Sequence, residues 1–340
     1  MKKNINSLSF WLHLTDNCNL TCDYCYISTL KTNRNMDKLV IVEFTNKLII
    51  TLKKHRNIKI VNLKLAGGEP LTQFEKWKSG IQFLINKLQE NDIKIKIRVI
   101  TNLTILNKDI IEFSQKNQIS FAVSLDGLDK YHNKYRKFIN QKGSFDIIQK
   151  NLLKLKKYKI PFAVLVTISN ENLEGIVELT KYLLDNNITF RLADAKGVNI
   201  NREKLLNVLN QVYKMMEDYP SFNIKYKHLL CDLNLIEPMK TSCNMGINAA
   251  AIYLNGDIYF CHSQFGSVNK MGSIYETDDL LEIIQKGYIF HSLSDECQKC
   301  EFKYICAGGC PLYRDHNNKT PMCDVFKKII PKIQNLILKY

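Results

Sequence analysis

The sequence predicts an α/β fold, because segments with the residue pattern of strands alternate with segments that have the period of helices. Six such alternations occur before about residue 193, and a cysteine-rich region follows them. The length of 340 residues fits a single α/β barrel or a barrel with an appended module. The hydrophobic fraction of 45% is typical of a folded globular chain.

Strands and helices take turns along the first part of the chain. The predicted strands span residues 10–14, 58–68, 93–102, 119–127, 161–169 and 188–193, and the predicted helices span residues 37–54, 74–89, 108–117, 144–157 and 173–186. Strands that alternate with helices pair in parallel through right-handed crossovers. These segments therefore predict a parallel sheet.

Polar or glycine-rich segments follow the predicted strands. They read TDNCNLTC, GGEP, TN, SLDG, TISN and RLAD in chain order. Functional loops of parallel α/β folds lie at the carboxyl ends of the strands, so these segments are the ones to examine for a site.

The pattern changes at about Asn201. A helix is predicted over residues 202–218, and residues 251–261 read as a hairpin that turns at Asn255 and Gly256. A final amphipathic helix over residues 324–340 is expected to be interrupted by Pro331. The sequence therefore predicts a second module after the parallel sheet.

Composition narrows the functional classes. The chain has no apolar run long enough to span a membrane and no signal-peptide core, so we expect a cytoplasmic protein without a membrane partner. The formal net charge of +15 could attract nucleic acid, an anionic membrane or an acidic peptide. The lysines are dispersed, with no arginine and aromatic array, which disfavours nucleic acid and favours an acidic peptide.

Eleven cysteines in a chain without a signal peptide indicate metal or cluster ligation, because reducing compartments keep thiols free of disulfides. Cys18, Cys22 and Cys25 can converge on one face of an iron-sulfur cubane and leave the fourth iron open to a small ligand. A three-cysteine zinc knuckle is the alternative. His13 is the nearest histidine, and its place inside a strand favours a role in the core.

These residues carry a family resemblance. The segment Cys18-x3-Cys22-x2-Cys25, with Tyr24 before the last cysteine, resembles the signature of radical S-adenosylmethionine (SAM) enzymes. Other strand ends resemble the same family, which implies a partial (β/α)6 TIM-like barrel over residues 1–200. The residues that would contact S-adenosylmethionine by this resemblance are Gly67, Gly68, Glu69 and Pro70 for the amino group, and Ser124, Asp126 and Arg136 for the carboxylate and ribose.

The sequence differs from the family at Thr101-Asn102-Leu103, where members of the family commonly have TNG. This change predicts a differently shaped loop on the substrate side. Asn102 is either a cofactor contact or a residue of the turn. Asn170 is a candidate contact for the adenosyl group, and a helix cap is the alternative.

The remaining eight cysteines lie in the second module. They are Cys231, Cys243, Cys261, Cys297, Cys300, Cys306, Cys310 and Cys323, and their spacing resembles the SPASM extension, a small cysteine-rich carboxy-terminal domain with two auxiliary 4Fe-4S clusters. This resemblance assigns residues 201–340 to a SPASM domain with bridging and terminal helices. Two zinc ribbons are the alternative.

By the same resemblance, one auxiliary cluster is distal and the other lies nearer the barrel. The distal cluster would bind Cys297, Cys300, Cys306 and Cys323, and the nearer one Cys243, Cys261 and Cys310. Cys231 is the candidate fourth ligand of the nearer cluster. If that cluster stays open, a substrate group could bind its iron, or Cys231 could donate a hydrogen atom.

The resemblance implies reductive cleavage of S-adenosylmethionine to a 5'-deoxyadenosyl radical, with three 4Fe-4S clusters and a low-potential electron donor such as flavodoxin or ferredoxin. The preferred function is maturation of a ribosomally made peptide through a thioether or carbon-carbon cross-link. Formylglycine formation, as in anaerobic sulfatase maturases, is the alternative, although His262 stands where that group has an aspartate base. His262 is either a base or a surface residue at a hairpin end. We also considered a non-enzymatic iron-sulfur or zinc protein, and we expect no appended leader-recognition domain.

Overall fold

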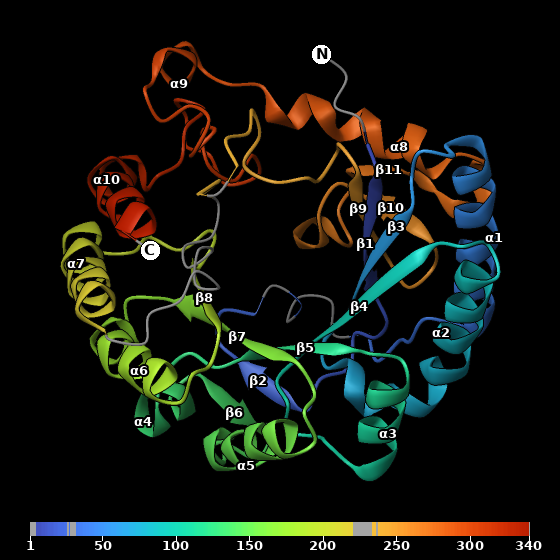
Figure 1. Ribbon diagram of the computed structural model, residues 1–340, viewed down its shortest axis with the longest axis horizontal. Helices are drawn as coiled ribbons and strands as arrows, with labels where there is room; N and C mark the ends of the chain where they lie inside the picture. Colours follow the sequence, from blue (N-terminus) through green and yellow to red (C-terminus); the bar gives the residue numbers. More distant parts are fainter. Residues whose placement is uncertain (1–4, 26, 28–31, 220–232, 236, 340) are drawn as a thin grey trace.

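Six parallel strands form the centre of the molecule (Figure 1). The computed structural model describes residues 5–25, 27, 32–219, 233–235 and 237–339. The six strands are β1 (Ser7–His13), β3 (Ile60–Ala66), β4 (Lys94–Thr101), β5 (Ser120–Ser124), β7 (Phe162–Ile168) and β8 (Phe190–Asp194). They pair in chain order, each parallel to the next, which confirms the predicted α/β fold.

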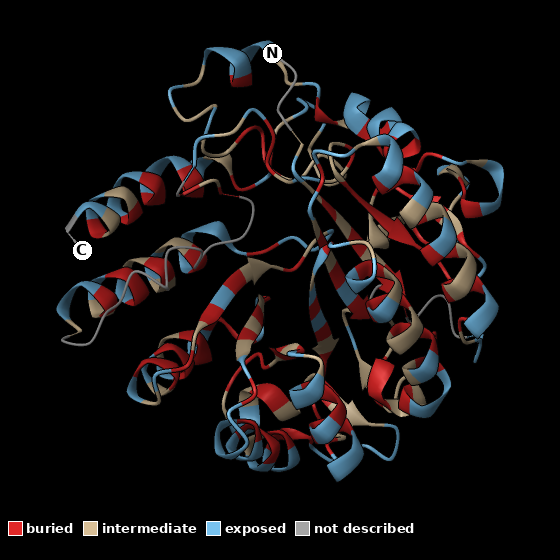
Figure 2. Ribbon diagram, turned by 45° about the vertical axis from the view of Figure 1, so that its right-hand side comes forward, coloured by how far each residue is buried: buried red, intermediate tan, exposed pale blue. Residues whose placement is uncertain are grey.

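Helices cover the outer face of this curved sheet (Figure 1). They are α1 (Lys38–Lys54), α2 (Phe74–Gln89), α3 (Lys108–Lys116), α4 (Asp129–Asn133), α5 (Phe145–Lys157) and α6 (Leu173–Asp185). Their apolar faces carry fully buried side chains such as Phe44, Trp77 and Ile148. The buried residues of the strands join the same core, because alternate strand residues face the helices. Figure 2 shows this pattern as buried stripes along otherwise exposed helices.

The sequence did not predict a second, two-stranded sheet. It pairs β2 (Leu20–Cys22) with β6 (Arg136–Phe138) in antiparallel orientation. Cys22 lies opposite Arg136 in this pairing. Strands of three residues carry too little periodicity to be recognised, yet this pair joins the first cysteine loop to the segment after β5.

The cysteine-rich region adds strands to the barrel sheet. The predicted hairpin is β9 (Ala249–Ile252) and β10 (Asp257–Tyr259), with Gly256 in its turn at a φ of 86°. β9 pairs in parallel with β1, and β11 (Lys270–Ser273) continues the sheet beyond β10. The hairpin therefore extends the edge of the parallel sheet, so the two regions share one nine-stranded sheet.

Helices of the second region pack against the first and the last large helices of the barrel. α7 (Arg202–Asp218) packs between α6 and α10 (Cys323–Lys339), and α8 (Leu280–Lys286) packs on α1 (Figure 1). α9 (Asp295–Lys299) carries Cys297. The expected interruption at Pro331 is wrong, because α10 continues through this residue. A proline removes one backbone hydrogen bond, and the buried apolar face of Val325, Ile329 and Ile333 holds the helix together around it. Among the described residues, no helix is both long and apolar enough to cross a membrane.

Candidate active site

The first three cysteines lie on the segment that follows β1. Cys18, Cys22 and Cys25 are each half-buried, and Cys22 ends β2. Burial raises the pKa of the Cys18 thiol to about 12 and that of the Cys22 thiol to about 11, and the neighbouring cysteine charges act in the same direction. The cysteines of this loop thus influence one another's charge, and several thiolates on one loop are the ligands that an iron-sulfur cluster prefers.

Nitrogen donors approach two of these sulfurs. The Leu20 backbone N–H and the Asn102 side-chain amide reach Cys18 Sγ at 3.4 and 3.9 Å. The Arg136 guanidinium reaches Cys22 Sγ at 3.8 Å. The Leu20 N–H and the Arg136 charge oppose the effect of burial on these two thiols, and donors to cluster sulfurs tune iron-sulfur sites.

Glu69 is the buried centre of the loops at this end of the sheet. Its Oε1 accepts hydrogen bonds from the Leu71 N–H at 3.0 Å and from Thr101 Oγ1 at 2.7 Å, and its Oε2 accepts from the Asn102 N–H at 2.6 Å. Burial raises the pKa of this carboxyl to about 7, and the three hydrogen bonds oppose that rise. Glu69 therefore ties the loop after β3 to the loop after β4, and it also caps the short helix Pro70–Gln73.

Gly67 and Gly68 let this loop touch the segment that leads to Cys18. A Cβ on Gly67 would lie 2.4 Å from the Thr15 carbonyl oxygen, and one on Gly68 would lie 2.3 Å from that of Asn17. The Gly68 and Glu69 N–H groups donate to the Thr15 and Asn17 carbonyls at 2.8 and 2.7 Å. The two glycines are therefore required for backbone packing against the cysteine loop, whatever ligand their carbonyls face.

The turn at Thr101-Asn102-Leu103 forms without the expected glycine. Leu103 adopts a φ of 55°, in the left-handed region that glycine favours, and its side chain is fully buried. Its N–H donates to Thr101 Oγ1 at 2.8 Å, and its carbonyl accepts from Asn151 at 2.9 Å. Asn102 is part of the turn, as one of its two expected roles requires, and its side chain also contacts Cys18.

Asp126 and Arg136 form a buried ion pair that also holds Tyr24. Asp126 Oδ2 accepts from the Arg136 Nε and from the Tyr24 hydroxyl, and its Oδ1 accepts from the Thr167 N–H at 2.8 Å. The Arg136 guanidinium lies 5.4 Å from the Tyr24 ring centroid. Burial and the Asp126 charge raise the pKa of Tyr24, while the Arg136 charge opposes this rise. This network fixes Arg136 between the cysteine loop and the end of β5.

Three other candidate contacts occupy different settings. Ser124 is half-buried at the end of β5, and the Pro70 carbonyl accepts from Trp77 Nε1 at 2.8 Å. Asn170 is exposed, and its side chain bonds the backbone of Asn199 and Asn201 at 2.9 and 2.7 Å. The structure thus uses Asn170 to hold the loop after β8 and does not join it to the network around Asp126.

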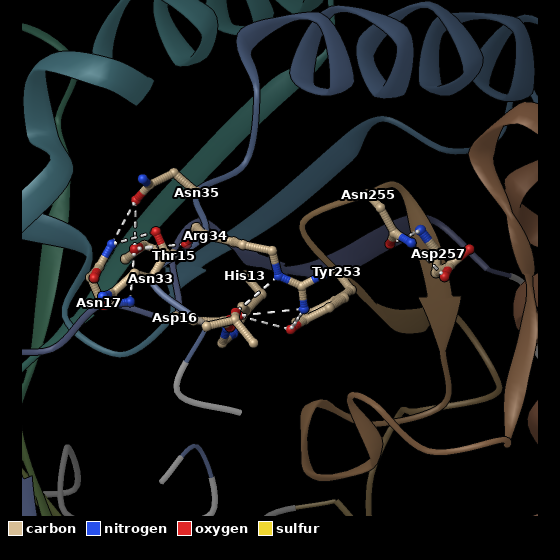
Figure 3. Close-up of polar contacts among 11 residues, drawn as sticks. His13, Thr15, Asp16, Asn17, Asn33, Arg34, Asn35, Tyr253, Asn255 and Asp257 are labelled. Carbon is tan, nitrogen blue, oxygen red and sulfur yellow. Dashed lines mark hydrogen bonds and ion pairs between the residues drawn. The ribbon is translucent and has the colours of Figure 1, made fainter. Parts of the chain in front are cut away.

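Asp16 connects the cysteine loop to the hairpin of the second region (Figure 3). Its Oδ1 accepts from His13 Nε2 at 2.8 Å, and its Oδ2 accepts from the Tyr253 hydroxyl at 2.9 Å. Burial lowers the pKa of His13, which is fully buried as expected for a core residue. Arg34 closes the group through a 3.1 Å hydrogen bond to the Tyr253 hydroxyl. The sequence analysis missed Asp16, although its position two residues before Cys18 was a usable signal.

Four cysteines of the second region influence the charge of one arginine. Arg314 interacts electrostatically with Cys243, Cys297, Cys306 and Cys310, and burial lowers its pKa. Cys297, Cys306 and Cys323 interact with one another, and burial raises the pKa of Cys306 to about 12. Cys300 is half-buried next to α9.

Other features of these cysteines bear on their ligand roles. No disulfide joins the ten cysteines that the structure describes. In the same part of the chain, no group of three histidine, cysteine or carboxylate side chains is arranged to hold a single metal ion. Cys231 lies outside the described residues.

His262 lies against the first strand of the barrel. Its ring stacks on the Trp11 ring with centroids 3.9 Å apart and an interplanar angle of 9°. Its Nδ1 lies 3.5 Å from Cys261 Sγ. Although burial by itself raises the pKa of Cys261, the charge of His262 and hydrogen bonds from His262 and Ser263 lower it to about 7. His262 is therefore half-buried beside a barrel strand, and its contact with Trp11 was not predicted from the sequence.

A family model described as the radical SAM superfamily matches residues 12–183, a span that holds the three cysteines and the loops around Glu69 and Asp126. The chain belongs to the radical SAM superfamily. It is therefore an enzyme that uses S-adenosylmethionine and a 4Fe-4S cluster. The non-enzymatic alternative is wrong.

Similar proteins extend the match to the whole chain. The chain is 25% identical over 348 residues to the cysteine-type anaerobic sulfatase-maturating enzyme of Clostridium novyi (strain NT), covering 94% of this chain and 92% of that one. Native anSMEcpe with bound AdoMet and Kp18Cys peptide aligns with a TM-score of 0.78 at 18% identity, covering 98% and 100% of the two chains. Streptococcus suis SuiB bound to precursor peptide SuiA aligns with a TM-score of 0.64 at 19% identity, covering 95% and 76%. The radical SAM enzyme thus shares its fold with both.

Proposed function

We propose that this radical SAM enzyme matures a ribosomally made peptide by oxidising or cross-linking it, through a thioether or a carbon-carbon bond. The observation that carries the proposal is the junction of β9 with β1, which sets Cys261 and His262 beside Trp11 of the barrel. A substrate next to Trp11 would contact the barrel and the cysteine-rich region at once. That arrangement suits a reaction in which the barrel starts the chemistry and the second region completes the oxidation.

The residues of the barrel fit the cofactors of the family. We propose that Cys18, Cys22 and Cys25 hold the 4Fe-4S cluster, because N–H donors already approach the first two sulfurs. When bound, the cluster and S-adenosylmethionine supply a 5'-deoxyadenosyl radical that removes a hydrogen atom from the substrate. The proposed contacts to S-adenosylmethionine are Gly67, Gly68, Glu69, Pro70, Asn102, Ser124, Asp126, Arg136 and Asn170.

The residues of the second region fit two auxiliary 4Fe-4S clusters. The interacting set of Cys297, Cys306 and Cys323, with Cys300, supports a distal cluster of four thiolates. Cys243, Cys261 and Cys310 would hold the nearer cluster, and Cys231 is the proposed fourth ligand or hydrogen donor. The Arg314 charge would favour thiolates in both sets.

His262 is the proposed base. A cross-link removes two hydrogen atoms from the peptide: one leaves as an atom, and the other leaves as a proton and an electron. The ring stacked on Trp11 can take the proton at Nε2 when Nδ1 carries a hydrogen toward Cys261 Sγ. An auxiliary cluster held by the cysteines of the second region would accept that electron, and a donor such as flavodoxin or ferredoxin would supply the one that cleaves S-adenosylmethionine.

Co-expression with short peptides encoded beside the gene tests this proposal. We expect one such peptide to lose the mass of two hydrogen atoms for each cross-link, as measured by mass spectrometry. His262→Asn should leave release of 5'-deoxyadenosine intact and lower formation of the cross-link. Unchanged masses for all neighbouring peptides would refute the peptide maturase function.

Formylglycine formation on a sulfatase is the second candidate. The alignment with the Clostridium novyi sulfatase-maturating enzyme over nearly the whole of both chains favours it. His262 in place of an aspartate disfavours it. A synthetic sulfatase peptide with cysteine or serine at the target position separates the two functions, because only a sulfatase maturase converts that residue to an aldehyde.

A further inference from the structure

The face of the parallel sheet that points away from the helices carries a set of positive charges. In β4, Ile97 and Val99 are buried toward the core, whereas Lys94, Lys96 and Arg98 alternate with them and are exposed. Side chains of paired residues in a sheet share a face. The pairing of β3 with β4 therefore puts Lys64 on the same face, opposite Arg98.

Arg191 lies on the same face, on β8 at the edge of the sheet. Arg98 pairs with Ser120 of β5, so Ser120 and Ser124 share its face of the sheet. Ser124 pairs with Leu165 of β7, and Leu165 pairs with Arg191 of β8, so Arg191 lies on that face too. Partial burial lowers the pKa of Arg98, and the charge of Arg191 lowers it further, so the two side chains are close enough to influence each other. Lys64, Lys94, Lys96, Arg98 and Arg191 are called the inner basic face below.

No carboxylate belongs to this face within the six described parallel strands. The other residues with the same orientation are serine, threonine, asparagine, histidine, tryptophan and apolar residues. Within the described part of the chain, Lys94, Lys96, Arg98 and Arg191 have no ion pair, in contrast to surface lysines such as Lys47. Like charges gathered without counter-charges repel one another and attract an anion.

The inner basic face adjoins the candidate site. Lys64 Nζ lies 5.7 Å from the centroid of the Trp11 ring, and His262 stacks on the same ring. Arg191 lies in the same row as Ser124, a proposed cofactor contact. A ligand that reaches Lys64 and its partner Arg98 would therefore lie next to Trp11, and Lys96 and Lys94 extend the face toward the amino end of β4.

We propose that the inner basic face binds an acidic segment of the substrate peptide, so that aspartate or glutamate residues flank the residue that the enzyme modifies. This inference rests on the proposed function, which makes a peptide the substrate, and it specifies that the peptide is acidic. Lys94, Lys96 and Arg98 follow one another along β4 without an ion pair among the described residues, so they match a run of carboxylates, and uniform charge speeds the approach of such a ligand. Because Lys64 of this face lies beside Trp11, where the substrate is proposed to bind, we assign the acidic segment to the substrate.

Binding of two labelled peptides to the reconstituted full-length protein tests the inference. One peptide carries alternating Glu and Asp residues, and the other has Gln and Asn at those positions. By fluorescence anisotropy, we expect the acidic peptide to bind at least about tenfold more tightly, with an affinity that falls as salt rises. Equal affinities for the two peptides would overturn the inference.

Paired variants locate the binding. Lys96→Gln with Arg98→Gln should weaken binding of the acidic peptide by roughly tenfold, while Lys96→Arg with Arg98→Lys should retain it. The control is Lys150→Gln with Lys154→Gln, which removes the same charge from exposed positions on α5. Equal weakening by the control and the inner variant would overturn the inference, as would tighter binding of a single-stranded oligonucleotide of equal charge.

These outcomes are separate from those of the proposed function. The binding measurement needs no turnover, so a protein that binds acidic peptides on this face and leaves neighbouring peptides unmodified would contradict the proposed function alone. A protein that modifies a neighbouring peptide without acidic preference would contradict this inference alone.

Discussion

Glu69 makes the stability of the apoprotein depend on pH. Its pKa is raised to about 7 by burial, so the folded state binds a proton more readily than the unfolded chain. Stability should therefore fall as pH rises from about 4.5 to about 7, and this contribution should level off above that range.

Glu69→Gln is expected to remove that dependence. It should also cost about 1–3 kcal/mol, because an amide N–H₂ would then oppose the Asn102 N–H that Glu69 Oε2 now accepts. Denaturant unfolding of both proteins across this pH range is the measurement. A variant whose unfolding free energy falls with pH as steeply as that of the wild type would contradict the assignment.

Leu103 predicts an unusual order of two substitutions. Both Leu103→Ala and Leu103→Gly lose a fully buried side chain, at about 2–5 kcal/mol. Glycine relieves the left-handed backbone, which costs other residues about 1–2 kcal/mol. The glycine variant should therefore be no less stable than the alanine variant, the reverse of the order in helices and strands. Unfolding free energies decide this, and a clearly less stable glycine variant would show that the turn is not strained.

At the residue scale, the sequence predicted which loops form the site, but not how they join. Glu69 was named as a cofactor contact, and its hydrogen bonds to Thr101 and Asn102 of the next loop were not predicted. Asp126 and Arg136 were named as cofactor contacts, yet their pairing with Tyr24 required the fold. These hydrogen bonds join residues 10 to 102 positions apart, and such bonds have no local pattern from which to predict them.

At the scale of elements, Asp279 holds the second region on α1. It caps α8 through the Leu281 N–H at 3.1 Å and accepts from Lys54 and His55 of the first region at 2.7 and 2.9 Å. We expect Asp279→Ala to lower the unfolding free energy by about 1–2 kcal/mol, because it removes a cap and a partly buried contact.

Asp278 is the matched control for this measurement. It pairs with Lys47 at 2.7 Å, but its side chain is 76% exposed, and exposed pairs contribute little. Asp278→Ala should change the unfolding free energy by less than about 0.5 kcal/mol. Equal effects of the two substitutions would show that Asp279 does not join the regions.

The long elements were predictable and the short ones were not. The periodic helices and the six parallel strands match their predicted ranges to within a few residues. β2 and β6 have three residues each, and the pairing of β9 with β1 joins segments about 240 residues apart. Such pairings are decided by tertiary packing, which periodicity does not report.

At the scale of the whole molecule, two regions that read as separate in sequence form one sheet. Hydrogen bonds among Asp16, Tyr253 and Arg34 join the cysteine loop to the hairpin of the second region. The proposed function places clusters in both regions, and the ligands of each should be separable by substitution.

The most direct test compares the anaerobically reconstituted protein with its Cys18→Ala, Cys22→Ala, Cys25→Ala triple variant. For each protein, the iron and acid-labile sulfide content is measured, and so is the 5'-deoxyadenosine released from S-adenosylmethionine. The account predicts about twelve iron atoms per wild-type chain and about eight in the variant, since each 4Fe-4S cluster holds four. Release of 5'-deoxyadenosine on reduction should occur only with the wild-type protein. Zinc in place of iron, or release by the triple variant, would contradict it.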